Sequence, residues 1–148
     1  MLDQLYQKVI LEHNKAPNNF GSLSTATHTA RGTDALCGDD IEMWLLVNDG
    51  VIERAHFSGE ACAVTKASAS MLTEWLQGRD VAEVGPSFEA FKALLDDPDH
   101  PAVTQLGSLN HLQAVGQFPA RRGNACLPWQ TTLEALATPS GSARCAVR

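Results

Sequence analysis

Residues 41–57, which read IEMWLLVNDGVIERAHF, decide the fold. The first seven are mostly apolar and the last seven alternate in polarity, and both patterns are typical of β-strands. Between them, Asn48-Asp49-Gly50 contains an Asp-Gly pair, which suits the positive φ angles of a tight hairpin turn. Upstream, the Thr- and Ala-containing segment from Thr25 to Arg31 predicts one more strand. Together these segments predict a small three-stranded antiparallel sheet.

Segments with helical periodicity precede and follow these predicted strands in the sequence. An amphipathic helix is expected over about Leu2–His13, and the period changes to helical again after Gly59, up to a stop at Gly78. Further helices are expected near residues 88–95, 106–115 and 127–136; Pro128 suits the first turn of the last one. The fold class is therefore α+β, a three-stranded antiparallel sheet with helices packed on one face. Residues 1–137 are expected to form a single domain, and the Ser-, Gly- and Ala-rich residues 138–148 a flexible tail.

Composition limits the classes of function. The chain has 148 residues, enough to bury a core without disulfides, and a formal net charge of −6. That charge argues against binding to nucleic acid, which needs a basic face. No stretch approaches the length of a membrane span, and the N-terminal residues lack a signal-peptide pattern. We therefore expect a cytoplasmic protein, in which cysteines are more often metal ligands or catalytic groups than disulfides.

Three cysteines and one aspartate are candidate site residues. Cys37 and Asp39 flank a glycine, Cys62 follows the turn that precedes a predicted helix, and Cys126 precedes Pro128-Trp129. Two or three thiolates with one carboxylate would form a mixed sulfur and oxygen site for a borderline-soft metal. Cys145 lies in the predicted tail and is expected to be a stray thiol.

Short motifs along nearly the whole chain carry a resemblance to a known family. They are Tyr6, ILEH at 10–13, PNNFG at 17–21, CGD at 37–39, FSG at 57–59, CAV at 62–64, ASASM at 67–71, LG at 106–107, FPAR at 118–121 and LPW at 127–129. In this order and spacing, they resemble the U-type iron–sulfur cluster assembly proteins, which include the scaffold IscU, its relative SufU and the N-terminal part of NifU. The resemblance covers residues 2–136.

The resemblance implies a site and a branch of the family. The metal site would lie at one exposed end of the fold, with Cys37, Asp39, Cys62 and a cysteine before the last helix as ligands. Cys126 follows Cys62 by 64 positions, a longer spacing than in the scaffold branch. The chain also lacks the histidine that precedes the third cysteine there, so it looks closer to the SufU branch.

The chain departs from the family at the fourth ligand. Counted from the motifs on either side, the family's third cysteine would fall at Asn124, whereas the cysteine here is Cys126. Two positions on a helix differ by roughly 200° of rotation. Either Gly123 to Cys126 form a loop that brings the Cys126 thiol round to the site, or Asn124, a poor zinc ligand, stands there instead.

By this resemblance, the protein is a zinc-dependent sulfur acceptor. It would take persulfide sulfur from a SufS-like cysteine desulfurase onto Cys126 and pass it to other cluster-assembly or acceptor proteins. That makes it a sulfurtransferase-like accessory protein rather than a self-standing enzyme. The alternative is a scaffold on which a [2Fe–2S] cluster is assembled on the same residues. A third possibility is a binding module that has lost its metal.

Overall fold

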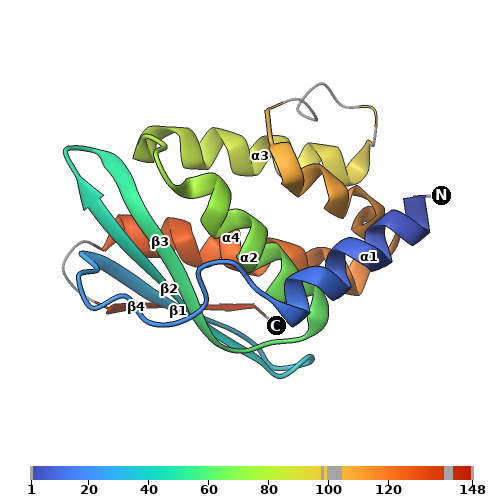
Figure 1. Ribbon diagram of the computed structural model, residues 1–148, viewed down its shortest axis with the longest axis horizontal. Coiled ribbons are helices and arrows are strands. Elements are labelled where there is room, and N and C mark those ends of the chain that lie inside the picture. The colour runs from blue at the N-terminus through green and yellow to red at the C-terminus, as the bar shows by residue number, and fades with distance from the viewer. Residues whose placement is uncertain (1, 98, 100–104, 139–141, 148) are drawn as a thin grey trace.

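The computed structural model describes residues 2–97, 99, 105–138 and 142–147. A sheet covered by helices makes up the molecule (Figure 1). Strands β1 (His28–Asp34), β2 (Asp39–Asn48) and β3 (Val51–Glu60) pair antiparallel with their sequence neighbours. The hairpin turn between β2 and β3 has Asp49 and Gly50 at φ of 53° and 77°, as the Asp-Gly signal predicted. The three-stranded antiparallel sheet is thus confirmed, although β1 extends three residues beyond the predicted end at Arg31.

A fourth strand joins the sheet from the other end of the chain. Residues Ser142–Val147 form β4, which pairs parallel with β1, and the strand order is β3-β2-β1-β4. This part of the chain was expected to be a flexible tail, and the strand corrects that expectation. Parallel pairing between residues more than a hundred positions apart leaves no local pattern to detect. The Cys145 side chain lies outside the described part of the structure.

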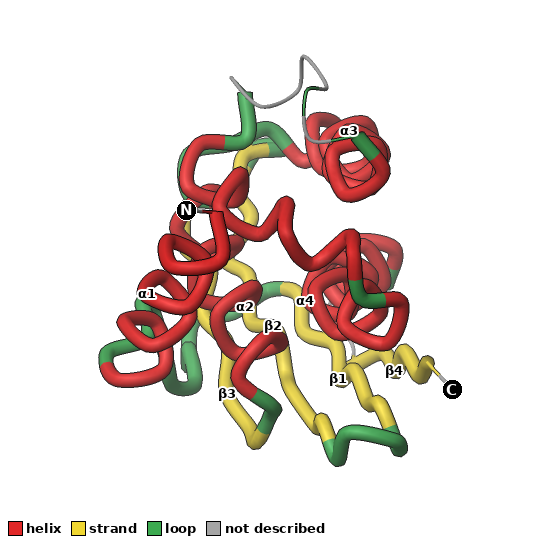
Figure 2. Tube along the Cα trace, turned by 90° about the vertical axis from the view of Figure 1, so that its right-hand side faces the viewer, coloured by secondary structure: helices red, strands yellow, loops and turns green. Residues whose placement is uncertain are grey.

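The helices lie on one side of the strands, as Figure 2 shows, and this confirms the predicted packing on one face. They are α1 (Leu2–Lys15), α2 (Ala63–Leu76), α3 (Val84–Asp96) and α4 (Pro119–Ala137), with the 3-10 helices η1 (Val81–Glu83) and η3 (Gly107–Gln117). Helix α4 crosses close to β1 at Gly32, where an added Cβ would collide with the Thr131 hydroxyl.

The core lies between the sheet and the helices. Trp129 on α4 is fully buried and packs among Trp75, Phe88 and Phe91, with ring centroids 5.4–5.6 Å apart. Met43, Leu45 and Phe57 contribute the inner face of the sheet. Among the helices of the described residues, none is long and apolar enough to cross a membrane.

Helix α4 begins eight residues before the predicted start. Pro119 occupies its first turn, and Pro128 lies inside the helix. An internal proline removes one helical hydrogen bond. Here the neighbouring Ala125 carbonyl accepts a bond from the Ser68 hydroxyl of α2 at 2.6 Å, so tertiary contacts support the helix at this point. Residues 123–126 are consequently helical, and the loop that was considered for them is absent.

Candidate functional site

Four segments meet at one corner of the sheet. The turn from β1 to β2 carries Cys37 and is closed by Gly38, whose φ of 70° favours glycine. Asp39 begins β2, and Cys62 is the N-cap residue of α2. Asn124 reaches the same corner from α4. The β1–β2 turn and the β2–β3 hairpin thus bring the first three residues together, whereas packing of α4 supplies the fourth.

Asp39 is the centre of this corner. Its carboxylate is 2% exposed and accepts the Cys62 backbone N–H on Oδ1 at 2.7 Å. Its other oxygen, Oδ2, accepts the Thr65 hydroxyl at 2.5 Å and the Asn124 amide N–H at 2.9 Å. These bonds offset the cost of removing a carboxylate from water. They also tie the start of β2 to the start of α2.

Asn124 connects two buried carboxylates. Its side chain is fully buried, and Nδ2 donates to Asp34 Oδ2 at 3.1 Å as well as to Asp39 Oδ2. Its amide oxygen faces the Cys37 thiol, with 3.6 Å between Cys37 Sγ and Asn124 Oδ1. Asp34, fully buried at the end of β1, also accepts the Leu36 backbone N–H at 3.1 Å. One neutral amide therefore contacts both acids and one thiol.

The two thiols at the corner are partly exposed. Cys62 Sγ lies 3.3 Å from the Thr65 hydroxyl and 3.9 Å from Asp39 Oδ2. The Arg121 guanidinium, on an exposed side chain of α4, lies 4.0 Å from the same sulfur. Cys37 stands on the turn and faces Asn124. Both cysteines are therefore partly open to solvent.

Cys126 has a different environment. It is 8% exposed and packs within the hydrophobic core, and no hydrogen bond of the described residues joins it to the corner. Burial raises the pKa of this thiol to about 11, despite the opposing effect of Arg122 and Lys92. Because Asn124 faces the corner from a continuous helix, a residue two positions on is turned by roughly 200°. The geometry does not favour the prediction that Cys126 is a metal ligand and sulfur acceptor.

The donor set differs from the predicted zinc site. Zn²⁺ sites in proteins use thiolate, imidazole and carboxylate donors, usually four in a structural site. Here Cys37, Cys62 and Asp39 are present, but the fourth place holds a neutral amide whose N–H₂ end points at Asp39. Among the residues that the structure describes, no group of three or more His, Cys, Asp or Glu side chains is arranged to hold a metal ion. These residues do not fit the four-donor site that the resemblance implied.

Three contributors to the corner were missed in the sequence. Thr65 lies one helical turn after Cys62, a spacing at which side chains on a helix meet. Asp34 pairs with Asp39 across the β1–β2 turn, so a longer first strand would have revealed it. Arg121 lies in the FPAR motif at 118–121, and nothing in that motif indicates that its side chain reaches Cys62. Asp34 and Arg121 lie in parts of β1 and α4 that the sequence pattern left outside these elements, whereas Thr65 lies inside the helix that the sequence predicted.

The motifs, the fold and the Cys-Gly-Asp corner indicate a class of protein, and comparison with known proteins identifies that class. The model of the NifU-like N-terminal domain matches residues 5–125, and the chain belongs to this family. A relative from Bacillus subtilis (strain 168), the zinc-dependent sulfurtransferase SufU, is 32% identical over 140 residues, which cover 95% of each chain.

Two further similarities agree with this assignment. The iron–sulfur cluster assembly scaffold protein IscU of Streptococcus pyogenes serotype M1 is 29% identical over 135 residues, covering 91% of this chain and 84% of that protein. A crystal structure of the N-terminal part of a nitrogen-fixing NifU-like protein from Brucella abortus has a TM-score of 0.79. It is 23% identical, covers 91% of this chain and 94% of its own, and supports the fold.

Proposed function

We propose that this protein acts in iron–sulfur cluster assembly as a sulfur acceptor that takes persulfide sulfur onto Cys62. The observation that carries the proposal is the pair of partly exposed cysteines, Cys37 and Cys62, beside the buried carboxylate of Asp39. Family membership and the similarity to a zinc-dependent sulfurtransferase support it. The donor would be a cysteine desulfurase, and the cytoplasmic setting predicted from the sequence belongs to the same proposal.

Cys62 is better placed than Cys126 for this role. The thiolate, not the thiol, attacks sulfur, and a thiol with a pKa of about 11 supplies very little thiolate at neutral pH. Cys62, in contrast, stands at the N-terminus of α2, where backbone amides favour negative charge. The Arg121 guanidinium, 4.0 Å from its sulfur, is a second partner for an anionic sulfur or persulfide.

The transfer is an exchange that needs no added oxidant. The Cys62 thiol loses its proton to solvent, because the residue is partly exposed. The thiolate attacks the outer sulfur of the donor's persulfide, and a new S–S bond forms on Cys62. The S–S bond of the donor breaks, and its cysteine leaves as a thiolate that takes up a proton. The same exchange, run onto a later acceptor, releases the sulfur.

The surface around the corner suits a protein donor. Leu36, next to Cys37, is 74% exposed, and Phe118 at the start of α4 is 48% exposed. Phe118, Tyr6 and Arg121 line a groove of about 380 Å³ whose walls are mostly apolar. Exposed apolar side chains around a reactive group are typical of a surface that a partner covers. A desulfurase that delivers its persulfide cysteine to Cys62 would contact these side chains.

One observation supports the alternative function as a scaffold, namely the similarity to a protein named IscU. Iron–sulfur clusters are generally held by four protein donors, mostly thiolates. The corner offers the two thiols Cys37 and Cys62 with Asp39, and Asn124 occupies the place of a further thiolate. Sulfur transfer requires only one accessible thiol, so we prefer it. Visible absorption after reconstitution with iron and sulfide would instead support the scaffold.

The test is to map the persulfide after a single round of transfer. The protein is incubated with a purified SufS-type cysteine desulfurase and L-cysteine, and each cysteine is then examined by mass spectrometry for one added sulfur atom. We expect the sulfur on Cys62, loss of acceptance in Cys62→Ser, and near-normal acceptance in the matched variant Cys126→Ala. Loss of acceptance in Cys126→Ala, with Cys62→Ser unaffected, would contradict the proposal.

A further inference from the structure

We propose that Asn124 replaces a metal ligand at this corner with a hydrogen-bonding amide, so that the protein binds Zn²⁺ far more weakly than the same corner would with cysteine at position 124. The inference concerns the metal and does not depend on the proposed sulfur transfer. It rests on the contacts of Asn124 and Asp39 and on the position of Cys126.

The first step is the count of free electron pairs on Asp39. A carboxylate oxygen has two lone pairs. Oδ2 accepts bonds from Thr65 at 2.5 Å and from Asn124 at 2.9 Å, so both of its pairs are occupied. Oδ1 accepts the Cys62 N–H at 2.7 Å and retains one pair. To gain a second Asp39 contact, a metal ion would have to break one of these buried bonds.

The second step concerns the electrostatic role of Asn124. Asp34 and Asp39 are both buried, and a bound cation is one way to stabilise buried acids. Here the N–H₂ group of Asn124 contacts both carboxylates, at 3.1 Å and 2.9 Å. The amide therefore supplies a hydrogen-bond donor to each of the two buried acids.

The third step is that Cys126 cannot supply the missing donor without refolding of α4. The residue lies inside a helix that runs from Pro119 to Ala137, and its side chain is buried in the core. Turning it to the corner would move Asn124 away from Asp34 and Asp39. It would also remove an apolar contact from the core.

The experiment measures zinc affinity by competition with a chromophoric chelator. Four forms are compared: the natural chain, Cys126→Ala, Asn124→Cys, and the double variant Asn124→Cys with Cys126→Ala. The double variant moves the cysteine from position 126 to position 124 and keeps the number of cysteines in the chain at four. Circular dichroism confirms that each form is folded.

We expect the natural chain and Cys126→Ala to bind zinc equally weakly. Both forms with cysteine at position 124 should bind zinc at least about 100-fold more tightly than the natural chain. Mutating groups that only hold a metal ligand in place changes metal affinity roughly 10–100-fold, and a direct ligand should matter at least as much. Zinc should also raise the unfolding temperature of these two forms more, since a ligand stabilises the state that binds it.

Two results would overturn the inference. One is a loss of zinc affinity in Cys126→Ala, which would make Cys126 a ligand. The other is an affinity of the natural chain equal to that of Asn124→Cys, which would show that the amide does not occupy a ligand position. No desulfurase is present in this experiment, so its outcome is separate from that of the persulfide mapping. A failure of sulfur transfer would leave the zinc result unchanged.

Discussion

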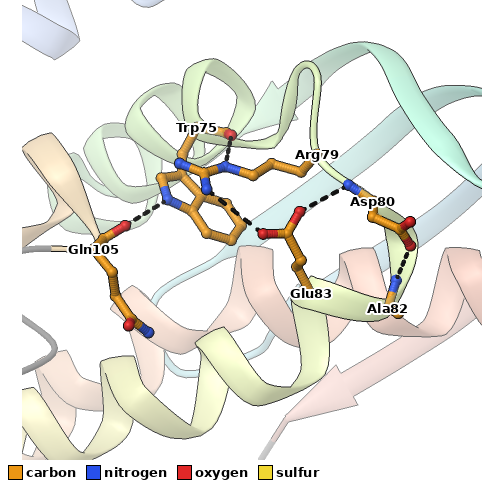
Figure 3. Close-up of polar contacts among 6 residues, drawn as sticks. All are labelled: Trp75, Arg79, Asp80, Ala82, Glu83 and Gln105. Atoms are coloured by element: carbon orange, nitrogen blue, oxygen red, sulfur yellow. Dashed lines mark hydrogen bonds and ion pairs between the residues drawn. The ribbon is translucent and has the colours of Figure 1, made fainter.

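The two ends of helix α2 are built in different ways. At its start, Cys62, Thr65 and Asp39 form a network with Asn124 in which the carboxylate, the hydroxyl and the amide are buried. Just beyond its end, Arg79 lies over the Trp75 ring, and Asp80 and Glu83 form a capping box at the surface (Figure 3). Buried polar groups are costly to leave unpaired, whereas exposed ones can turn to water. The polar groups at the start of α2 therefore depend on one another for their hydrogen bonds. Those beyond its end can exchange their partners for water.

The largest effect is expected from Asn124→Ala. The variant removes one donor from each of two buried carboxylates, and we expect the free energy of unfolding to fall by roughly 3 kcal/mol. Urea denaturation measures it. Asn18→Ala is the matched control, because Asn18 Nδ2 also donates to a carboxylate, Glu74, but at an exposed site. That control should lose less than about 1 kcal/mol. Equal losses in the two variants would remove the distinction between buried and exposed networks.

The second prediction uses the alkaline pH dependence of stability. Below about pH 9, Cys126 keeps its proton in both states; between its ordinary pKa of 9.0 and the folded pKa of about 11, only the unfolded state loses it. Ionisation then stabilises the unfolded state, so stability falls as pH rises through this window, by roughly 2–3 kcal/mol in total. The natural chain should therefore lose more stability than Cys126→Ala between about pH 8 and about pH 10.5.

Urea unfolding at several pH values measures both slopes. Parallel slopes would mean that Cys126 is not held as a buried neutral thiol. The comparison uses slopes because Cys126→Ala also loses packing in the core at every pH.

The local parts of the fold and site could be predicted from the sequence. The hairpin of β2 and β3 follows from the Asp-Gly turn, and Cys37, Asp39 and Cys62 meet because they stand where adjacent elements begin. The position of Asn124 also follows from counting between motifs. Its orientation does not, because it depends on where α4 begins, and Pro128 gave a false helix start inside a helix that Ser68 and the core support.

Contacts with no local signal could not be predicted. Strand β4 pairs with β1 from more than a hundred positions away, and Asp34 reaches Asn124 from 90 positions away. Hydrophobic periodicity describes which face of an element is buried and says nothing about which polar side chains meet inside. The polar centre of the site therefore required the structure.

A third, smaller effect is expected from Thr65→Val. The change keeps the shape of the side chain but removes the hydroxyl that donates to Asp39 Oδ2 at 2.5 Å. A hydrogen bond to a buried charged group is worth roughly 2 kcal/mol, and the free energy of unfolding should fall by that amount. The matched control is Thr132→Val, whose hydroxyl donates to the neutral Pro128 carbonyl at 2.8 Å and should cost roughly 1 kcal/mol. A smaller loss for Thr65→Val than for its control would show that Asp39 does not depend on this hydroxyl.

The smallest effect is expected beyond the end of α2, from Arg79→Ala. The Arg79 guanidinium lies 4.3 Å from the Trp75 ring centroid, its Nε donates to the Trp75 carbonyl at 3.2 Å, and its ion pair with Glu83 is long, at 3.8 Å (Figure 3). Cation–π contacts at such sites contribute roughly 0.5–1 kcal/mol, and exposed ion pairs no more. Unfolding in urea should show that the free energy of unfolding falls by less than about 1 kcal/mol, because water can replace the contacts that the guanidinium made. A loss as large as that of Asn124→Ala would mean that both ends of the helix carry equal weight, and burial would not explain the difference between them.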